Sequence, residues 1–463
     1  MTDETPKTPG ARLLSLDLLR GFDMILLTVV GPLFWAVNKI WQMPEAVQAQ
    51  FRHAWGGFTL WDLIMPLFLF ACGAAIPYAL PKRLDANGRP GRRFWCHVFG
   101  RVALLWFCGL LVQGNLATLN IYKISPFNNT LQTIAVGYLL GALVMLIPLR
   151  VVRVVIPALL LAVYCVLLHL LGDYSKTGNF AAIVEADVLN ALLPAANQFV
   201  VNMIDPQIGV PYGGYTWFLT SLMFGFMTLC GAQCAEILRG AWTPAKKGAA
   251  LAVVGAVLLA LGHGLVFLGV PAIKHIFTAS FTLQAMGWSA LLFAVLYFIA
   301  DVARLRRGWW FVTLFGQCAL TAYMTTQFFG PVLDAAARLV TQGFPAYVGK
   351  TYMPLVNAVT AIVLLTVVCW ARRRMRRAAV VPAPVAVVPV PVAETSAAPS
   401  APSAVPADAV AERFRIPGLA AAKPIQLKPP AGPVPAPAAV PEKPATADGP
   451  IRSTKTNLKL HKE

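Results

Sequence analysis

The sequence predicts an all-α fold, a polytopic bundle of about ten transmembrane helices followed by a disordered C-terminal tail. The chain of 463 residues is 57% hydrophobic and only 13% charged, whereas soluble domains are about a quarter charged. Apolar runs long enough to cross a hydrocarbon core of about 30 Å recur through the first four fifths of the chain. They lack the short alternation of polar and apolar residues that is typical of a membrane β-barrel.

The apolar runs predict ten spans, in order at 16–38, 58–80, 101–115, 131–149, 151–171, 215–238, 249–270, 279–301, 309–329 and 352–371. The first run is expected to remain as a span. The residues before it are mixed in charge, and no small-residue cleavage site follows it.

The basic residues sort to one side of this bundle. They gather in the second, fourth, sixth and eighth connections and after the last span. Because cytosolic loops carry an excess of Lys and Arg, both termini are predicted to be cytosolic. The net charge of +18 then reflects topology and attraction to anionic lipid, and a nucleic-acid partner is not expected.

Composition divides the chain into three parts. Residues 1–12 form a cytosolic N-terminus, 13–377 the transmembrane domain, and 378–463 a disordered cytosolic tail rich in Pro and Ala. The tail is interpreted as a solvated spacer, with recruitment of a partner through its proline segments as the alternative.

The stretch from His53 to Gly73 carries the strongest signal of a site. It places Asp62 just inside an apolar helix, where charge is normally excluded. Imidazole exchanges protons near neutral pH, so His53 is a candidate general base, with Asp62 orienting it. The alternatives are an interfacial histidine among lipid headgroups and a carboxylate that caps its helix.

Other polar residues near the predicted outer surface are candidates for contacts with a sugar. Trp55 could stack on a sugar ring or belong to the aromatic belt at the membrane interface. The amides of Asn128, Asn129 and Gln132 could bind hydroxyl groups or cap the fourth span. Lys274 lies between the seventh and eighth spans and could contact substrate or a lipid headgroup.

Charged residues near the cytosolic edge could hold an anionic cosubstrate. Asp17 and Arg20 are three residues apart, so they share a helix face and can pair. Together with Arg101 they form a candidate binding site for phosphate groups. The spacing of the eight cysteines implies neither disulfides nor a metal site.

Four segments resemble the heparan-α-glucosaminide N-acetyltransferase family, and more closely its bacterial inner-membrane relatives. They are R-L-L-S-L-D-L-L-R-G-F-D, H-A-W-G-G-F-T-L-W-D-L-I-M-P-L-F-L-F-A-C-G, N-N-T-L-Q-T-I-A-V-G-Y-L and P-A-I-K-H-I-F-T-A-S-F-T-L. The resemblance implies a multi-pass enzyme of the bacterial inner membrane. Such an enzyme moves an acetyl group from cytosolic acetyl-CoA, a co-substrate and not a permanently bound cofactor, to an amino sugar or glycan on the other side.

Within this resemblance, His53 corresponds to the family's active histidine, and Asp62, Pro66 and Gly73 match the element that follows it. The sequence departs from the family in two places. His53 stands two residues before Trp55, where the family's spacing is three, and Gly31 occupies the position of an asparagine in the animal enzymes.

Two other classes of function remain open at this point. A transporter or flippase for a glycan or lipid precursor would move its substrate without consuming acetyl-CoA. A membrane scaffold would depend on its tail. The expected partners are the lipid bilayer, acetyl-CoA and a small amino sugar or glycan, and self-association into a homo-oligomer remains open.

Overall fold

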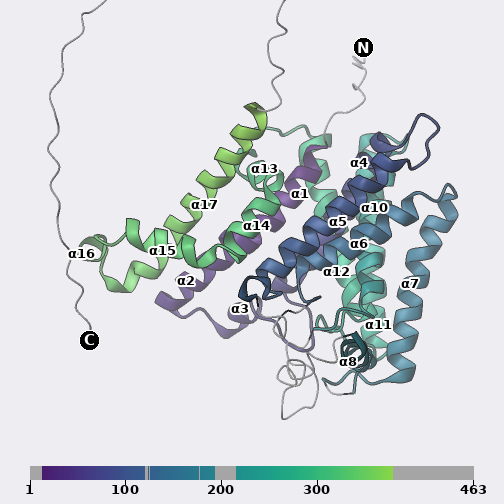
Figure 1. Ribbon diagram of the computed structural model, residues 1–463, viewed down its shortest axis with the longest axis horizontal. Helices are drawn as coiled ribbons and strands as arrows, with labels where there is room; N and C mark the ends of the chain where they lie inside the picture. The colour runs from purple at the N-terminus through teal and green to yellow at the C-terminus, as the bar shows by residue number, and fades with distance from the viewer. Residues whose placement is uncertain (1–12, 120–123, 125, 177, 193–214, 379–463) are drawn as a thin grey trace, which may run out of the picture. The chain divides into compact units, whose positions relative to one another are not determined.

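The computed structural model describes residues 13–119, 124, 126–176, 178–192 and 215–378, and all regular elements in these ranges are helical (Figure 1). The predicted all-α class is confirmed for them. The predicted tail, apart from its first residue, lies outside the described residues, as does most of the loop before Tyr215.

Eight helices are long and apolar enough to cross a membrane, and they indicate a membrane protein. They cover Leu14–Trp41, Leu60–Ala79, Arg92–Val112, Arg150–Leu171, Ser221–Arg239, Pro244–Phe267, Ala279–Val302 and Lys350–Arg376. Within these spans the elements are α1 (Leu14–Ile25), a π-helical turn (Leu26–Val30), α2 (Gly31–Trp41), a 3-10 turn (Leu60–Leu63), α4 (Ile64–Ala79), α5 (Arg92–Val112), α7 (Arg150–Leu171), α10 (Ser221–Arg239), α11 (Pro244–Phe267), α12 (Ala279–Tyr297), a second π-helical turn (Phe298–Val302), the 3-10 turn Lys350–Tyr352 and α17 (Met353–Ala378).

Shorter helices fill the connections. They are α3 (Glu45–Ala49), α6 (Thr130–Met145), α8 (Phe180–Leu192), α13 (Trp310–Gln317), α14 (Ala319–Gln327), α15 (Gly330–Val340) and α16 (Pro345–Val348), with 3-10 turns at Pro81–Arg83 and Leu116–Thr118.

The ninth predicted span, 309–329, is not one helix. The chain leaves helical geometry at Cys318, with φ −111° and ψ 20°, and this separates α13 from α14. The Cys318 thiol donates to the carbonyl of Cys369 on α17. The break is tied to a contact between distant segments, which apolar periodicity cannot reveal. The fourth predicted span corresponds to α6, which is shorter than the eight helices above.

The third span also differs from its prediction. It was expected at 101–115, but α5 begins at Arg92, so Arg101 lies in mid-helix and not in the basic connection before it. The Arg101 guanidinium stacks 4.4 Å from the ring centroid of Tyr138 and lies 3.7 Å from the Cys72 sulfur. These contacts give an intramembrane cation partners within the bundle.

The bundle packs around α4, which contacts α1, α6, α10 and α12. The crossing of α4 and α10 depends on two glycines. A Cβ atom on Gly73 would overlap the carbonyl oxygen of Thr228, and one on Gly231 would overlap that of Phe70. Small residues allow such close approach of helix backbones in membranes, where packing replaces the hydrophobic effect between helices.

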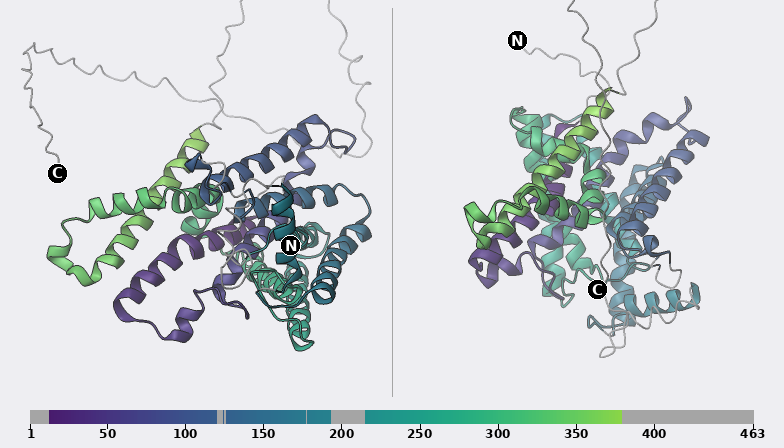
Figure 2. Two further views of the ribbon diagram at one scale, coloured as in Figure 1. Left: turned by 60° about the horizontal axis from the view of Figure 1, so that its bottom comes forward. Right: turned by 60° about the vertical axis from the view of Figure 1, so that its left-hand side comes forward.

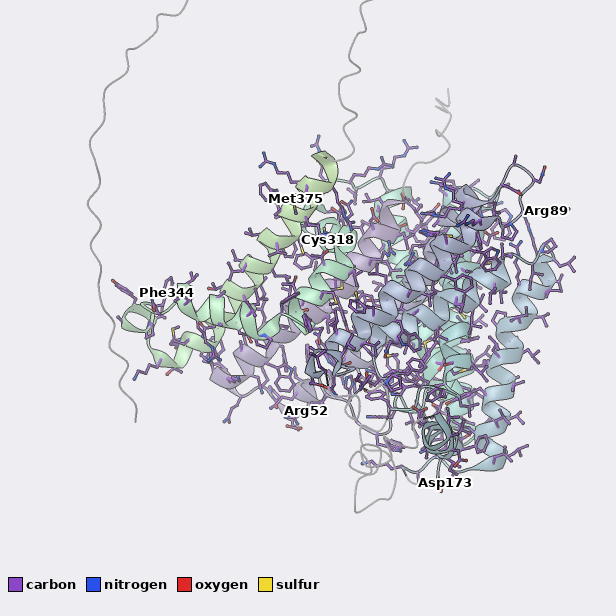
Figure 3. The ribbon with its side chains drawn as sticks, viewed as in Figure 1. Arg52, Arg89, Asp173, Cys318, Phe344 and Met375 are labelled. Carbon is purple, nitrogen blue, oxygen red and sulfur yellow. The ribbon has the colours of Figure 1, made fainter. Side chains whose placement is uncertain are left out.

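The two ends of the bundle differ in charge. Arg89, in the second connection, and Met375, which lies among arginines at the end of α17, are at the same end (Figure 3). Arg52 and Asp173 lie at the opposite end. We call these the basic end and the His53 end. The shared end agrees with the predicted sorting of basic residues for these two segments.

Candidate active site

Asp62 is held in place by the start of its own helix. Thr59 is the N-cap of the 3-10 turn that leads into α4, and the two residues form a capping box. The backbone N–H of Thr59 donates to Asp62 Oδ2 at 3.1 Å. A carboxylate is also favoured there by the positive end of the helix dipole.

The second oxygen of the same carboxylate holds His53. Asp62 Oδ1 lies 2.7 Å from His53 Nδ1, with the Asp62 side chain 1% exposed and that of His53 34% exposed. Both predicted roles of Asp62, cap and orienter of the imidazole, are thus filled at once. If Nδ1 donates its proton to Asp62, the lone pair of Nε2 is left to accept one from a substrate.

Lys274 completes a triad with these two residues. Its Nζ lies 3.4 Å from Asp62 Oδ1 and 3.2 and 3.4 Å from the two ring nitrogens of His53. Because these last two distances are nearly equal, Nζ lies beside or over the ring and not on the axis of the Nε2 lone pair. Lys274 is almost fully buried, and burial lowers its pKa to about 8 although the Asp62 carboxylate opposes this.

Hydrogen bonds fix the position of the loop between α11 and α12, which carries Lys274. Thr278 Oγ1 accepts from the Ile273 amide at 2.9 Å and donates to the Pro271 carbonyl at 2.8 Å. The Gly57 amide donates to the Ala272 carbonyl at 2.8 Å and so joins this loop to the one that carries His53. The hydroxyl of Tyr164 on α7 donates to the Ile276 carbonyl.

Aromatic rings form one wall of the site. The His275 ring is stacked between Trp55, at a centroid distance of 5.2 Å, and Tyr215, at 4.6 Å. Tyr215 meets the His53 ring edge-on at 6.4 Å. Trp55 donates its indole N–H to the carbonyl of Tyr174, so its polar atom is already used. Burial lowers the pKa of His275 to about 4, and this ring therefore stays neutral at physiological pH.

Glu185 on α8 anchors the segment that carries Tyr215. Its Oε2 accepts the backbone N–H groups of Trp217 and Phe218, both at 2.9 Å. The residue is 3% exposed, and burial raises the pKa of its carboxyl group to about 7. A carboxylate from outside the segment therefore sets the position of one wall of the site.

The predicted sugar-binding amides are engaged in the fold at the start of α6. Asn129 accepts from the Leu131 amide at 2.7 Å and donates to Gln113 Oε1 at 2.8 Å. Gln132 accepts from the Asn128 amide and donates to the Pro126 carbonyl. These bonds favour the helix-capping interpretation, and a substrate contact by Asn128, Asn129 or Gln132 stays a prediction.

Two of the three predicted cosubstrate residues line one cavity inside the bundle. Arg20 and Arg101 face a space of about 110 Å³ with Cys72, Thr130 and Tyr323 among its other lining residues. The walls come from α1, α4, α5, α6 and α14. The third residue lies elsewhere, since Asp17 accepts from Gln317 Nε2 at 3.4 Å and is not part of this lining.

Sequence reasoning missed several of these relations. Lys274 was a substrate candidate, but nothing in the sequence placed it against His53, 221 residues away. Glu185 carried no recognisable motif. Asp23 is a further buried carboxyl group, and neither of its oxygens has a hydrogen-bond partner among the described residues. Its signal in the sequence was an acidic residue within the first apolar run, which also holds Asp17 near its start.

The residues of the described part of the chain do not form a group of three or more His, Cys, Asp or Glu side chains able to hold a metal ion. Residues 12–143 match the model of a family described as a domain of unknown function (DUF5009). This match covers Arg20, His53, Asp62 and Arg101 and ends before Lys274. No curated protein matches the chain.

Proposed function

We propose that this protein is a transmembrane acyltransferase that moves an acetyl group from acetyl-CoA to an amino sugar or glycan. The observation that carries the proposal is the Asp62–His53 pair, with Lys274 beside it, at the end opposite the basic clusters. A buried carboxylate, an oriented imidazole and an adjacent ammonium together supply the groups that thioester aminolysis needs. The resemblance described above supports the same reaction.

In this proposal His53 Nε2 takes a proton from the acceptor amine as its nitrogen attacks the thioester carbonyl. Asp62 keeps the ring oriented and stabilises the imidazolium that forms. The Lys274 ammonium stabilises the negative oxygen of the tetrahedral intermediate. Collapse of that intermediate expels the thiolate of coenzyme A, which takes up the proton from His53.

Acetyl-CoA would approach from the basic end, which we propose to be cytosolic. The chain would cross the bacterial inner membrane ten times and have both termini in the cytosol. Arg20 and Arg101 would contact the anionic part of the co-substrate as it enters. The cavity that they line is smaller than the roughly 300–1,000 Å³ of a typical ligand pocket. Binding of acetyl-CoA would therefore require this cavity to widen.

A thiol-release assay tests the proposal. Membranes containing the full chain are given acetyl-CoA and a panel of amino sugars, and free coenzyme A is measured. His53→Ala is expected to abolish release that depends on the acceptor. His263→Ala is the matched control, because the His263 ring only bonds a carbonyl of its own helix and is exposed. Transport of the sugar without thiol release, or full activity in His53→Ala, would contradict the proposal and favour a transporter.

Labelled acetyl-CoA without acceptor separates two routes of transfer. Direct transfer leaves the protein unlabelled. A route through acetyl-histidine leaves label on the wild type and none on His53→Ala.

A further inference from the structure

A second cavity lies apart from His53, between α2, α15 and α17. Its volume is about 610 Å³, and none of His53, Asp62 and Lys274 lines it. α17 packs against both other helices, and the three lie side by side at the edge of the bundle (Figures 1 and 2). We call this cavity the α2–α17 crevice.

The crevice is charged at one end and mainly apolar at the other, where Thr28 also lines it. Lys39 lies near the end of α2, and Lys350 lies just before α17. Since α2 and α17 run in opposite directions, these two cations lie at the same end of the crevice. The deeper part is lined by Leu27, Ile362 and Leu365. An occupant must therefore combine a polar group with an apolar portion.

The charge at the polar end is positive. Lys39, Arg338 and Lys350 line it against a single carboxylate, Asp334. Among the described residues no carboxylate lies within ion-pair distance of these three cations. Three cations that line one space with a single, more distant carboxylate leave a net positive charge there, which is complementary to an anionic group such as phosphate.

The exposure of the side chains on α15 indicates whether the crevice opens to water or to lipid. Asp334 and Arg338 are four residues apart, and both line the crevice. Val332 and Leu339 are 66% and 68% exposed. The exposed surface of α15 therefore carries large apolar side chains beside the exposed Asp334 and Arg338, which is unusual for a helix at a water-facing surface. This pattern fits a crevice that opens to lipid.

We propose that the α2–α17 crevice binds an anionic phospholipid. The headgroup phosphate lies between Lys39, Arg338 and Lys350, and the first part of an acyl chain lies along Ile362 and Leu365. Soluble phosphate shares the headgroup chemistry, but it would leave the apolar half of the crevice unfilled. The lipid reading is preferred for that reason.

Binding of radiolabelled phosphatidylglycerol to the purified, delipidated full chain in an uncharged detergent tests this. The expected result is one saturable site, displaced by unlabelled phosphatidylglycerol but not by phosphatidylcholine or inorganic phosphate. Lys39→Ala/Arg338→Ala/Lys350→Ala should bind about 100-fold more weakly, at roughly fivefold for each cation removed near a lipid headgroup. Asp334→Asn should bind more tightly.

The matched control is Lys82→Ala/Lys246→Ala/Arg306→Ala, three exposed cations that do not line the crevice. It should bind as the wild type does. Ala361→Phe, which fills the apolar part without changing charge, should also weaken binding. Unchanged binding in the crevice triple variant, or displacement by inorganic phosphate as effective as by phosphatidylglycerol, would overturn the proposal.

Discussion

The two carboxylate oxygens of Asp62 bind different partners. Oδ2 accepts from the Thr59 amide and starts the helix, and Oδ1 holds His53 Nδ1. The sequence supported both interpretations because the carboxylate stands three residues after a threonine and nine after a histidine. The structure shows that one rigid helix start fixes the imidazole, which is the kind of preorganisation that an active site needs.

The proposed role of the Lys274 ammonium leads us to expect that kcat/KM depends on pH. Its pKa is lowered by burial to about 8, so the ammonium is present below that pH and is lost as the pH rises through it. If the ammonium stabilises the transition state, kcat/KM of the wild type should fall above about pH 8. Lys274→Met should be slower at neutral pH and should lack this limb.

The measurement is a pH profile of thiol release for both proteins from about pH 6 to about pH 10. A wild-type profile that stays level to the highest pH, or a Lys274→Met profile with the same descending limb, would assign the effect to another group.

At the scale of elements, α2 and the start of the second span meet through Gly31. A Cβ atom on this residue would overlap the ring of Trp61. Trp61 lies beside Asp62 in the turn that begins the span. Gly31 therefore makes room for an indole next to the site.

Gly31→Ala should displace Trp61 and reduce stability by about 1–3 kcal/mol, as overpacking of a tight contact usually does. Gly264→Ala is the control. Gly264 lies in α11 with nothing within 4 Å of the added Cβ, and alanine should be neutral or stabilising there by up to about 1 kcal/mol. Thermal unfolding in detergent measures both, and equal effects of the two changes would contradict the packing argument.

The Glu185 anchor gives a second element-scale prediction. Folding raises the pKa of this carboxyl group from 4.5 to about 7. Between these pH values the folded protein holds a proton that the unfolded chain lacks, so the group's contribution to stability is greatest below about pH 4.5 and is lost as the pH rises through about 7. The melting temperature of the wild type should fall relative to that of Glu185→Gln from about pH 5 to about pH 8.

Glu185→Ala separates titration from anchoring, because it leaves the Trp217 and Phe218 amides without their acceptor. An unsatisfied buried amide costs about 1–3 kcal/mol. This variant should be less stable than Glu185→Gln at every pH, and a Glu185→Gln protein that unfolds as Glu185→Ala does would show that the hydrogen bonds contribute nothing.

Sequence and structure agree where local rules decide. Apolar length predicted most of the spans, and the Asp62 cap and its histidine are close in sequence. The structural contacts that the sequence did not reveal at Arg101, Cys318 and Lys274 have a common cause. A cation stays inside a helix because Tyr138 covers it, a span breaks where a thiol meets a distant helix, and a lysine reaches the site from a loop more than 200 residues away. Each depends on tertiary contacts that periodicity does not contain.

At the scale of the whole molecule, the proposed reaction requires donor and acceptor to lie at opposite ends of the bundle. The basic clusters at Arg89 and around Met375 lie at one end, and Arg52, which adjoins His53, lies at the other. An acetyl donor at the basic end and an acceptor at the His53 end would meet only through the bundle. The cavity lined by Arg20 and Arg101 lies within it, between α1, α4, α5, α6 and α14.

Sealed proteoliposomes test this claim most directly. Vesicles with one orientation of the protein are loaded with an amino sugar, and labelled acetyl-CoA is added outside. The account predicts labelled N-acetyl sugar inside the vesicles for the wild type when the basic end faces outward, and none for His53→Ala. Product that forms only when donor and acceptor are on the same side, or equal product from the His53 variant, would contradict it.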